Sequence, residues 1–207
     1  MFNKITLLGV LAMLCLNFKA MAQKPISEIK PNSLSFGDSL SRTQFGSKGG
    51  ALKVGDKLPE SFWQQEHTIY ANGQTTTQTL ARNKGKLLIL DFWATWCGSC
   101  VQKFPLLDSL RQKNMNTLLV NSKKAKEGFR QVDQFFRNNE MALKYPQQSI
   151  LNDHYLERLF PYKQLPHYVW IDYQGRVIAI TNYLFPSVAL VDVVLAAQQR
   201  ALAKLQR

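Results

Sequence analysis

The sequence predicts an α/β fold in which a mixed central sheet is covered by helices. Three observations lead to it. A nearly continuous apolar run at residues 86–93 has the composition of a strand that is buried on both faces. The next segment, residues 98–112, has apolar side chains at intervals of three, as a helix requires. Further along, two short apolar segments, residues 167–172 and 176–181, are separated by a tight turn and predict an antiparallel hairpin.

The size and charge of the chain limit what it can be. Its 207 residues, less the N-terminal segments, are sufficient for one domain whose core needs no cross-links. The formal net charge is +12, and the densest basic cluster consists of Lys123, Lys124, Lys126 and Arg130. This cluster predicts attraction to an acidic partner or weak association with a membrane surface. Nucleic acid is not an expected partner, because no recognised binding motif accompanies the charge.

Residues 1–22 have the pattern of a secretory signal. Lys4 precedes an apolar run at residues 5–16, and Ala20-Met21-Ala22 supplies the small residues of a cleavage site. We therefore expect export to the periplasm or cell envelope, where disulfide chemistry is permitted.

Two other interpretations of this segment remain open. The first is an uncleaved anchor, although the apolar run is shorter than the roughly 20 residues that a membrane span needs. The second is lipidation at Cys15, although Leu14 occupies the place of the usual small residue. After the signal, residues 23–52 have no hydrophobic period and predict a flexible lead-in, which leaves residues 53–207 as the folded domain.

The folded part begins with an expected edge hairpin. Residues 67–70 and 75–78 flank Asn72-Gly73, a pair that tolerates the positive φ angles of a type I′ turn. Residues 86–93 follow as the central strand.

A parallel βαβ unit comes next. The helix predicted at residues 98–112 contains Pro105, which should bend it. Residues 115–121 predict the next strand, and its parallel pairing with residues 86–93 gives a right-handed unit.

Two helices are predicted between this unit and the C-terminal hairpin. The first covers residues 126–139 and the second residues 153–160, ending before Pro161. We expect the first to bury four apolar side chains, namely Phe129, Val132, Phe135 and Phe136.

A final helix starts at Pro186 and completes the domain. Its inner side is marked by Val188, Val191, Val194 and Leu195. The order βαβ followed by ββα describes a thioredoxin fold, here with an N-terminal hairpin extension and a helical central insertion.

The feature most informative about function is Cys97-Gly98-Ser99-Cys100, placed directly between the central strand and a helix. At this position the first sulfur meets free backbone N–H groups and the positive end of the helix dipole, which stabilise a thiolate. A structural disulfide or a zinc site would need more cysteines than this chain has, and haem attachment would need His where Val101 stands. The motif therefore predicts a redox site.

A family resemblance supports this interpretation. Residues 91–100 read Asp-Phe-Trp-Ala-Thr-Trp-Cys-Gly-Ser-Cys, and Leu165-Pro166 and the hairpin at residues 169–176 follow. In these motifs the chain resembles the exported TlpA/ResA-like thiol-disulfide oxidoreductases of the thioredoxin superfamily, from about Val54 to the C-terminus. The resemblance implies a thioredoxin fold and an oxidoreductase without a bound cofactor.

The roles of the two cysteines follow from their chemistry. Cys97 is expected to be the nucleophile, because it meets solvent and the helix N-terminus first. Cys100 lies one turn further in and is expected to resolve the mixed disulfide, for which its thiol must lose a proton.

Asp91 is the expected proton acceptor. The resemblance to thioredoxin places a buried carboxylate at this position, and burial raises the pKa of such a group toward neutrality. The alternative is a structural Asp bonded to backbone, in which case Glu66 is the next base to consider. Many TlpA/ResA relatives have Asn here and an acid in the helix, where this chain has Lys103.

Three residues are expected to bind the substrate. Pro166 resembles the cis-proline of the family, which packs against the cysteine pair. This leaves the backbone of Leu165 free to pair with an extended substrate. Trp96 is expected to shield the pair on the substrate side, whereas ordinary packing accounts equally well for Trp93.

The histidines are expected to have ordinary structural roles. His167 follows Pro166 and could tune the thiolate or join a metal site, but a neutral strand histidine is the favoured interpretation. His67 and His154 have no ligand-like spacing and are expected on the surface or in the core.

The leading hypothesis is an exported dithiol-disulfide oxidoreductase that acts on protein thiols and disulfides. The resemblance favours a reductase supplied with electrons by a membrane donor, although Gly98-Ser99 does not decide between reduction and oxidation. The alternative is a copper chaperone that uses Cys97, Cys100 and His167. A peroxidase of the peroxiredoxin type would need a Pro/Thr-rich loop around its cysteine, which is absent.

Overall fold

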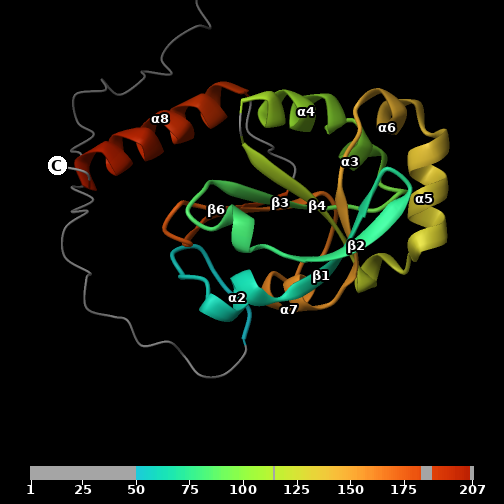
Figure 1. The fold of residues 1–207 in the computed structure, drawn as a ribbon, viewed down its shortest axis with the longest axis horizontal. Helices are drawn as coiled ribbons and strands as arrows, with labels where there is room; N and C mark the ends of the chain where they lie inside the picture. The colour runs from blue at the N-terminus through green and yellow to red at the C-terminus, as the bar shows by residue number, and fades with distance from the viewer. Residues whose placement is uncertain (1–49, 114, 183–187, 206–207) are drawn as a thin grey trace, which may run out of the picture. The chain divides into compact units, whose positions relative to one another are not determined.

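A seven-stranded sheet in the order β2-β1-β5-β4-β3-β6-β7 forms the centre of the fold (Figure 1). The computed structural model describes residues 50–113, 115–182 and 188–205, which fall within the unit formed by residues 47–207. The expected signal and most of the expected lead-in lie outside the described residues. The strands are β1 Glu66–Ala71, β2 Gln74–Thr79, β3 Leu88–Phe92, β4 Asn116–Ser122, β5 Ser149–Asp153, β6 His167–Ile171 and β7 Val177–Thr181.

Helices cover both faces of this sheet. In Figure 1, α4 lies above the sheet, and α2 and α7 lie below it. The short helices are α2 Glu60–Gln64, η2 Ala81–Asn83, α3 Gly98–Val101, η3 Lys123–Ala125, α6 Glu140–Lys144 and α7 Tyr155–Leu159. The longer ones are α4 Phe104–Gln112, α5 Phe129–Asn138 and α8 Val188–Leu205. None of the helices within the described ranges has both the length and the apolar character of a membrane span.

The two faces of the sheet bury separate cores. Side chains alternate along β3, so Ile89 packs with α4 and α5, whereas Leu88 and Leu90 pack with α2 and α7. Every residue of β3 is buried, as predicted for the central strand. This strand pairs parallel with β4 and antiparallel with β6, so the predicted βαβ unit and C-terminal hairpin share it and the thioredoxin arrangement is confirmed.

The N-terminal hairpin is also confirmed. β1 and β2 pair antiparallel around Asn72 and Gly73, whose φ angles are 51° and 80°. β2 is an edge strand, as expected, while β1 pairs on its other side with β5.

The central insertion contains more than the predicted helices. Residues 149–153 form β5, which pairs parallel with β4 and so joins the hairpin to the rest of the sheet. The helix predicted at residues 153–160 is accordingly shorter, since Asp153 belongs to the strand. Apolar side chains in this segment fit either a short strand or a helix, and only the pairing distinguishes them.

Two predicted helices differ in their boundaries. The first is broken into α3 and α4 at Gln102 and Lys103, because Pro105 cannot donate a hydrogen bond to the preceding turn. The second begins at Phe129 instead of Lys126, whose φ of 58° is left-handed. The prediction that Phe129 is buried was wrong: 47% of it is exposed at the first position of the helix.

Pro186, the predicted start of the final helix, lies outside the described residues. The described helix runs over Val188–Leu205, and Val194 and Leu195 pack against the core, as predicted. The side chains of Val188 and Val191 are not among those described.

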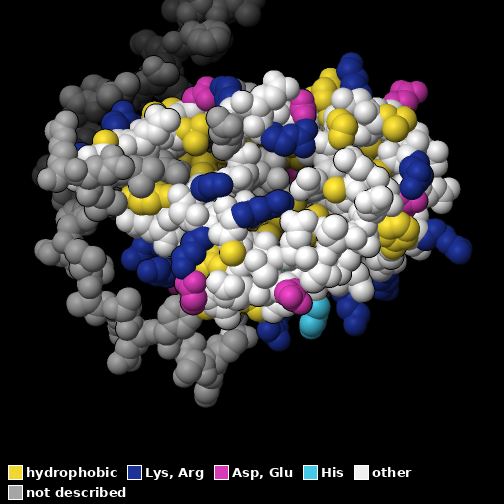
Figure 2. Space-filling model, viewed as in Figure 1, with side chains coloured by type: hydrophobic (Ala, Val, Ile, Leu, Met, Phe, Trp, Pro, Cys, Tyr) yellow, Lys and Arg dark blue, Asp and Glu magenta, His cyan; other side chains and the backbone are white. Residues whose placement is uncertain are grey.

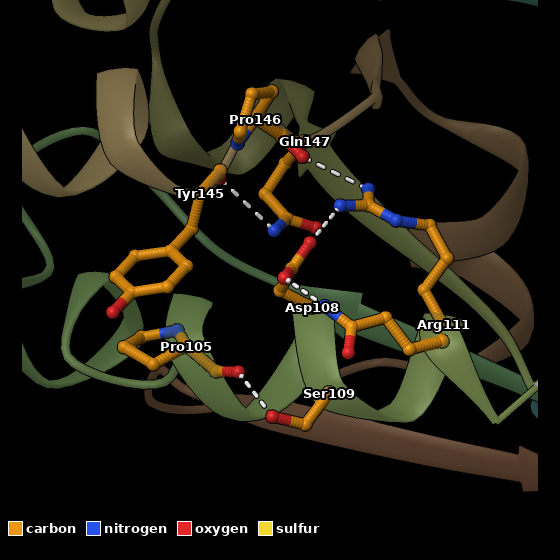
Figure 3. Close-up of polar contacts among 8 residues, drawn as sticks. Pro105, Asp108, Ser109, Arg111, Tyr145, Pro146 and Gln147 are labelled. Atoms are coloured by element: carbon orange, nitrogen blue, oxygen red, sulfur yellow. Dashed lines mark hydrogen bonds and ion pairs between the residues drawn. The ribbon is translucent and has the colours of Figure 1, made fainter.

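Polar contacts attach α4 to the segment before β5 (Figure 3). Arg111 donates from Nη1 to the carbonyl oxygen of Pro146 at 2.8 Å and forms an ion pair with Asp108 one turn earlier. In the same segment, Gln147 donates to the carbonyl oxygen of Tyr145 at 3.1 Å. The insertion is thereby fixed against the helix that continues from the cysteine motif.

Candidate active site

Cys97 and Cys100 form a disulfide at the end of β3. The S–S distance is 2.02 Å and the two Cα atoms are 5.3 Å apart. Cys97 is 5% exposed and Cys100 is fully buried. The order of exposure is the one expected if Cys97 meets a partner first.

A tight turn places Cys97 at the N-terminus of α3. Its backbone N–H donates to the carbonyl oxygen of Ala94 at 3.0 Å, and its own carbonyl accepts from Cys100 at 3.0 Å. The hydroxyl of Ser99 lies 3.6 Å from the Cys97 sulfur. The chain therefore bends directly into α3, and the sulfur of Cys97 has a polar neighbour.

Asp91 lies on the same face of the sheet as the cysteines. Alternation along β3 directs its side chain with those of Ile89 and Trp93, which belong to the same core cluster as Cys97 and Cys100. The side chain is fully buried, and neither carboxylate oxygen has a hydrogen-bond partner among the described residues. Burial raises the pKa of Asp91 well above its ordinary value, because nothing replaces the lost hydration of the charged form.

Tyr168 is the cross-strand neighbour of Asp91. The two residues are paired directly in the antiparallel β3–β6 ladder, so their side chains share a face. Burial, and secondarily the charge of Asp91, raise the pKa of the Tyr168 hydroxyl. Burial thus disfavours the charged form of both groups.

The Leu165–Pro166 peptide bond is cis. His167, which follows it, pairs with Phe92 at the end of β3, so this peptide lies at the same edge of the sheet as the cysteine turn. Leu165 is half-buried between the two cores. Among the described residues, no hydrogen bond is formed by its backbone N–H or C=O.

The two tryptophans of the motif have different surroundings. Trp96 is 66% exposed, and its ring nitrogen lies 3.5 Å from the carbonyl oxygen of Ala125. Trp93 is fully buried, donates to the Ser149 hydroxyl at 2.9 Å, and packs against Phe135 and Phe136. Trp96 is thus available to a partner, and Trp93 is a core residue.

The histidines do not join the cysteines. His167 pairs with Phe92, whose side chain belongs to the opposite core, and its Nδ1 lies 3.1 Å from Oδ1 of Asn182. Burial lowers its pKa, so it is a neutral strand histidine, the favoured interpretation of the sequence. His67 is a core residue bonded to Asp153 at 2.8 Å, and His154 is exposed before α7.

Of the two remaining charged residues, Glu66 lies away from the pair, whereas the backbone N–H of Lys103 donates to the carbonyl oxygen of Cys100 at 3.0 Å. Glu66, the alternative base, is exposed at the start of β1. Two strands separate β1 from β3, so the structure does not bring Glu66 to Cys100. Lys103 stands at the break between α3 and α4.

Glu127 was missed by sequence reasoning. It is only 8% exposed and accepts hydrogen bonds from the backbone and hydroxyl of Thr95, two residues before Cys97. The available signal was weak: Glu127 is the sole acidic residue in the basic stretch 123–130.

Two surface cavities lie elsewhere. They have volumes of about 320 and 400 Å³ and are lined by residues that include neither cysteine. The disulfide therefore lies in neither of these two cavities.

The chain is similar to known proteins over most of its folded domain. The family model described as Redoxin matches residues 53–189. A thioredoxin from Coprinus comatus is 48% identical over 31 residues, which cover 15% of this chain and 29% of that protein, so the match spans under a third of the relative.

Two solved structures are also similar. One, from Chlorobium tepidum, is named as a candidate thiol:disulfide interchange protein DsbE. It is 25% identical, with a TM-score of 0.51, over 72% of this chain and 99% of that one. The other is a secreted Mycobacterium tuberculosis disulfide oxidoreductase homologous to E. coli DsbE. It is 16% identical, with a TM-score of 0.51, over 67% of this chain and 99% of that one, and shows the fold alone.

Proposed function

The chain belongs to the Redoxin family, and from that membership we propose that it is an exported thiol–disulfide oxidoreductase acting through Cys97 and Cys100. The observation that supports this most directly is the bonded cysteine pair at the end of β3, above the buried carboxyl of Asp91. A dithiol that opens and closes in place transfers two electrons without a bound cofactor.

The reaction runs through a mixed disulfide. In the reduced enzyme, the Cys97 thiolate attacks one sulfur of a substrate disulfide, forms a new S–S bond and releases the other sulfur as a thiolate. The Cys100 thiol then gives up its proton and attacks the Cys97 sulfur. The enzyme is left as the disulfide, and the substrate leaves with two thiols, having gained two electrons and two protons.

Asp91 accepts the proton of Cys100, directly or through water. Burial raises the pKa of this carboxyl and so brings it closer to the pKa of a thiol. Proton transfer from Cys100 to Asp91 therefore costs less free energy than transfer to an exposed carboxylate. Its placement on the cysteine face of β3 supports this role.

The substrate is an extended segment of a protein. The backbone of Leu165 pairs with it, Pro166 packs beside the disulfide, and the exposed ring of Trp96 covers its apolar side chains. These three residues lie around the same edge of the sheet as Cys97.

We further propose that the enzyme acts in the cell envelope, as its resemblance to the TlpA/ResA-like oxidoreductases implies. Residues 1–22 act as the export signal, and the enzyme works as a reductase supplied by a membrane electron donor. Figure 2 shows Lys and Arg side chains spread over one face of the molecule, which supports weak association with an acidic membrane surface.

The copper chaperone receives no support from the geometry. His167 faces the opposite core from the cysteines. In the described part of the chain, no three His, Cys, Asp or Glu side chains come together as a metal site. Titration of the mature protein with copper and zinc, beside an insulin reduction assay, separates the two functions.

The test of the cysteine roles uses two serine variants. Cys97→Ser is expected to abolish disulfide exchange, whereas Cys100→Ser should accumulate a mixed disulfide with the substrate, because only resolution is removed. Non-reducing gels and mass spectrometry of the trapped species measure both. Trapping through Cys100 instead of Cys97 would reverse the assignment.

The direction of transfer is tested separately. The equilibrium of the pair with glutathione should give a potential near that of thioredoxin if the enzyme is a reductase. A value near the strongly oxidising end of the thioredoxin superfamily would make it an oxidase.

A further inference from the structure

Glu127 is a buried carboxylate that the reaction described above does not use. It lies between η3 and α5 and is 8% exposed, although the stretch 123–130 around it is otherwise basic or apolar, apart from Gly128. A charged side chain is rarely buried without partners that compensate for the lost water. Its partners therefore indicate what it does.

Three hydrogen-bond donors converge on this carboxylate. Thr95 donates from its backbone N–H at 3.0 Å and also from its hydroxyl. Asn121, which is fully buried, donates from Nδ2 at 2.7 Å. The ionised carboxylate is the form that only accepts, so it satisfies all three donors. Glu127 thus joins the turn after β3 to the end of β4.

The contact with Thr95 continues to the nucleophile. The N–H of Thr95 and the C=O of Ala94 belong to one peptide group, and that C=O accepts from the N–H of Cys97 at 3.0 Å. A chain of hydrogen bonds therefore runs from the carboxylate through this peptide to the backbone of Cys97. Such chains polarise each bond in the same direction.

We propose that Glu127 is a positioning residue that holds the Cys97 turn in place, and that its negative charge destabilises the thiolate of Cys97. The inference rests on the proposed function, because it concerns the same cysteine pair. A like charge disfavours an anion, and a less stable thiolate makes the reduced form less stable. Glu127 thereby keeps the pair reducing.

Two other titratable groups lie on the cysteine face, and burial acts against the charge of each. Asp91 is fully buried without a hydrogen bond among the described residues, and burial raises its pKa, so its charged form is disfavoured, whereas three donors stabilise the carboxylate of Glu127. Burial also raises the pKa of Tyr168, so its charged form is disfavoured as well. Within the described part of the chain, Glu127 is hydrogen-bonded to Thr95 and Asn121 and to no cation.

The test changes the charge and the shape of the Glu127 side chain in separate variants. Glu127→Gln keeps the shape and loses the charge, so Cys97 in the reduced protein should be alkylated about threefold faster below its thiol pKa. The potential against glutathione should become more oxidising. Glu127→Asp keeps the charge and should leave the alkylation profile unchanged.

A matched control and a second variant complete the test. Glu157 accepts a hydrogen bond from the backbone N–H of Lys124 at 3.0 Å, so Glu157→Gln removes a nearby carboxylate without changing the Cys97 turn. Neither the alkylation rate of Cys97 nor the potential against glutathione should change in this variant. Thr95→Val removes one donor from Glu127 and leaves its charge less compensated. It should slow alkylation of Cys97, whereas Thr95→Ser should behave as the wild type.

The variants Thr95→Val and Thr95→Ser test the proposal even if Glu127→Gln does not fold. The proposal is overturned if Glu127→Gln folds but keeps the wild-type alkylation profile and potential, or if Thr95→Val does not slow alkylation. Both readouts use the protein without a substrate. Failure to reduce insulin would therefore refute the proposed function and leave this inference standing.

Discussion

At the scale of single residues, Asp91 distinguishes this site from an ordinary strand end. Its carboxyl is fully buried on the cysteine face, and neither oxygen is bonded within the described residues. A structural Asp at a strand end would be expected to accept backbone hydrogen bonds instead. An unpaired carboxyl with a raised pKa is costly to the fold, so a chemical role is the better explanation.

Asp91→Asn should slow resolution of the mixed disulfide near neutral pH while leaving the first attack by Cys97 largely intact. The amide keeps the shape of the side chain but cannot accept the Cys100 proton, so a loss of about 10²-fold is expected in the resolving step. Stopped-flow exchange with a model disulfide, measured across pH, reports the two steps separately.

The control for this experiment is Asp192→Asn, which removes an exposed carboxylate of α8 that is paired with Lys113 at the C-terminal end of α4. Its two rates should equal those of the wild type. A resolving step that is unaffected by Asp91→Asn at every pH would make Asp91 structural.

At the scale of elements, the turns after the strands place the functional groups. The turn after β3 carries Cys97, the end of β4 leads to Glu127, and the cis peptide precedes β6. All three lie at one edge of the sheet because β3 and β4 run parallel and β6 runs antiparallel to them. The β1–β2 hairpin, with its turn at Asn72-Gly73, lies near one end of the strand order and is separated from β4 by β5.

This turn can be tested at Gly73. Its φ of +80° is left-handed, and a Cβ there would lie 2.6 Å from Nη2 of Arg137, which is paired with Asp133. Gly73→Ala should therefore lower the free energy of unfolding by about 1 to 2 kcal/mol for the backbone, and by more if the ion pair is displaced.

Gly85 is a matched control, because its φ is +79° and nothing lies within 4 Å of its Cβ position. Gly85→Ala measures the backbone cost alone in the same denaturation experiment. Equal losses in the two variants would mean that Arg137 moves aside freely.

At the scale of the whole molecule, one sheet separates two apolar cores, and a single acidic group is buried within the cysteine-side core without a hydrogen bond among the described residues. The pKa of Asp91 is higher in the folded than in the unfolded chain. Folding therefore binds a proton between these two pKa values, and stability falls as the pH rises through that interval. The redox site thus destabilises the fold above acidic pH.

Asp91→Asn should be more stable than the wild type near neutral pH, by about 1 to 3 kcal/mol. The difference should shrink as the pH falls to the ordinary pKa of Asp, about 4, and below it, because the wild-type carboxyl becomes protonated in both states. Denaturant unfolding of the oxidised proteins at a series of pH values measures this. A difference that stays constant with pH would contradict a raised pKa.

Local sequence determined much of this protein. The apolar run of β3, the Asn72-Gly73 turn and the Cys97–Cys100 spacing each depend on neighbouring residues alone, and each predicted its element correctly. Only the tertiary structure decided the strand β5, the exposure of Phe129 and the partners of Glu127. The physical reason is that burial and pairing depend on which distant segment comes to lie alongside, and a local pattern does not contain that information.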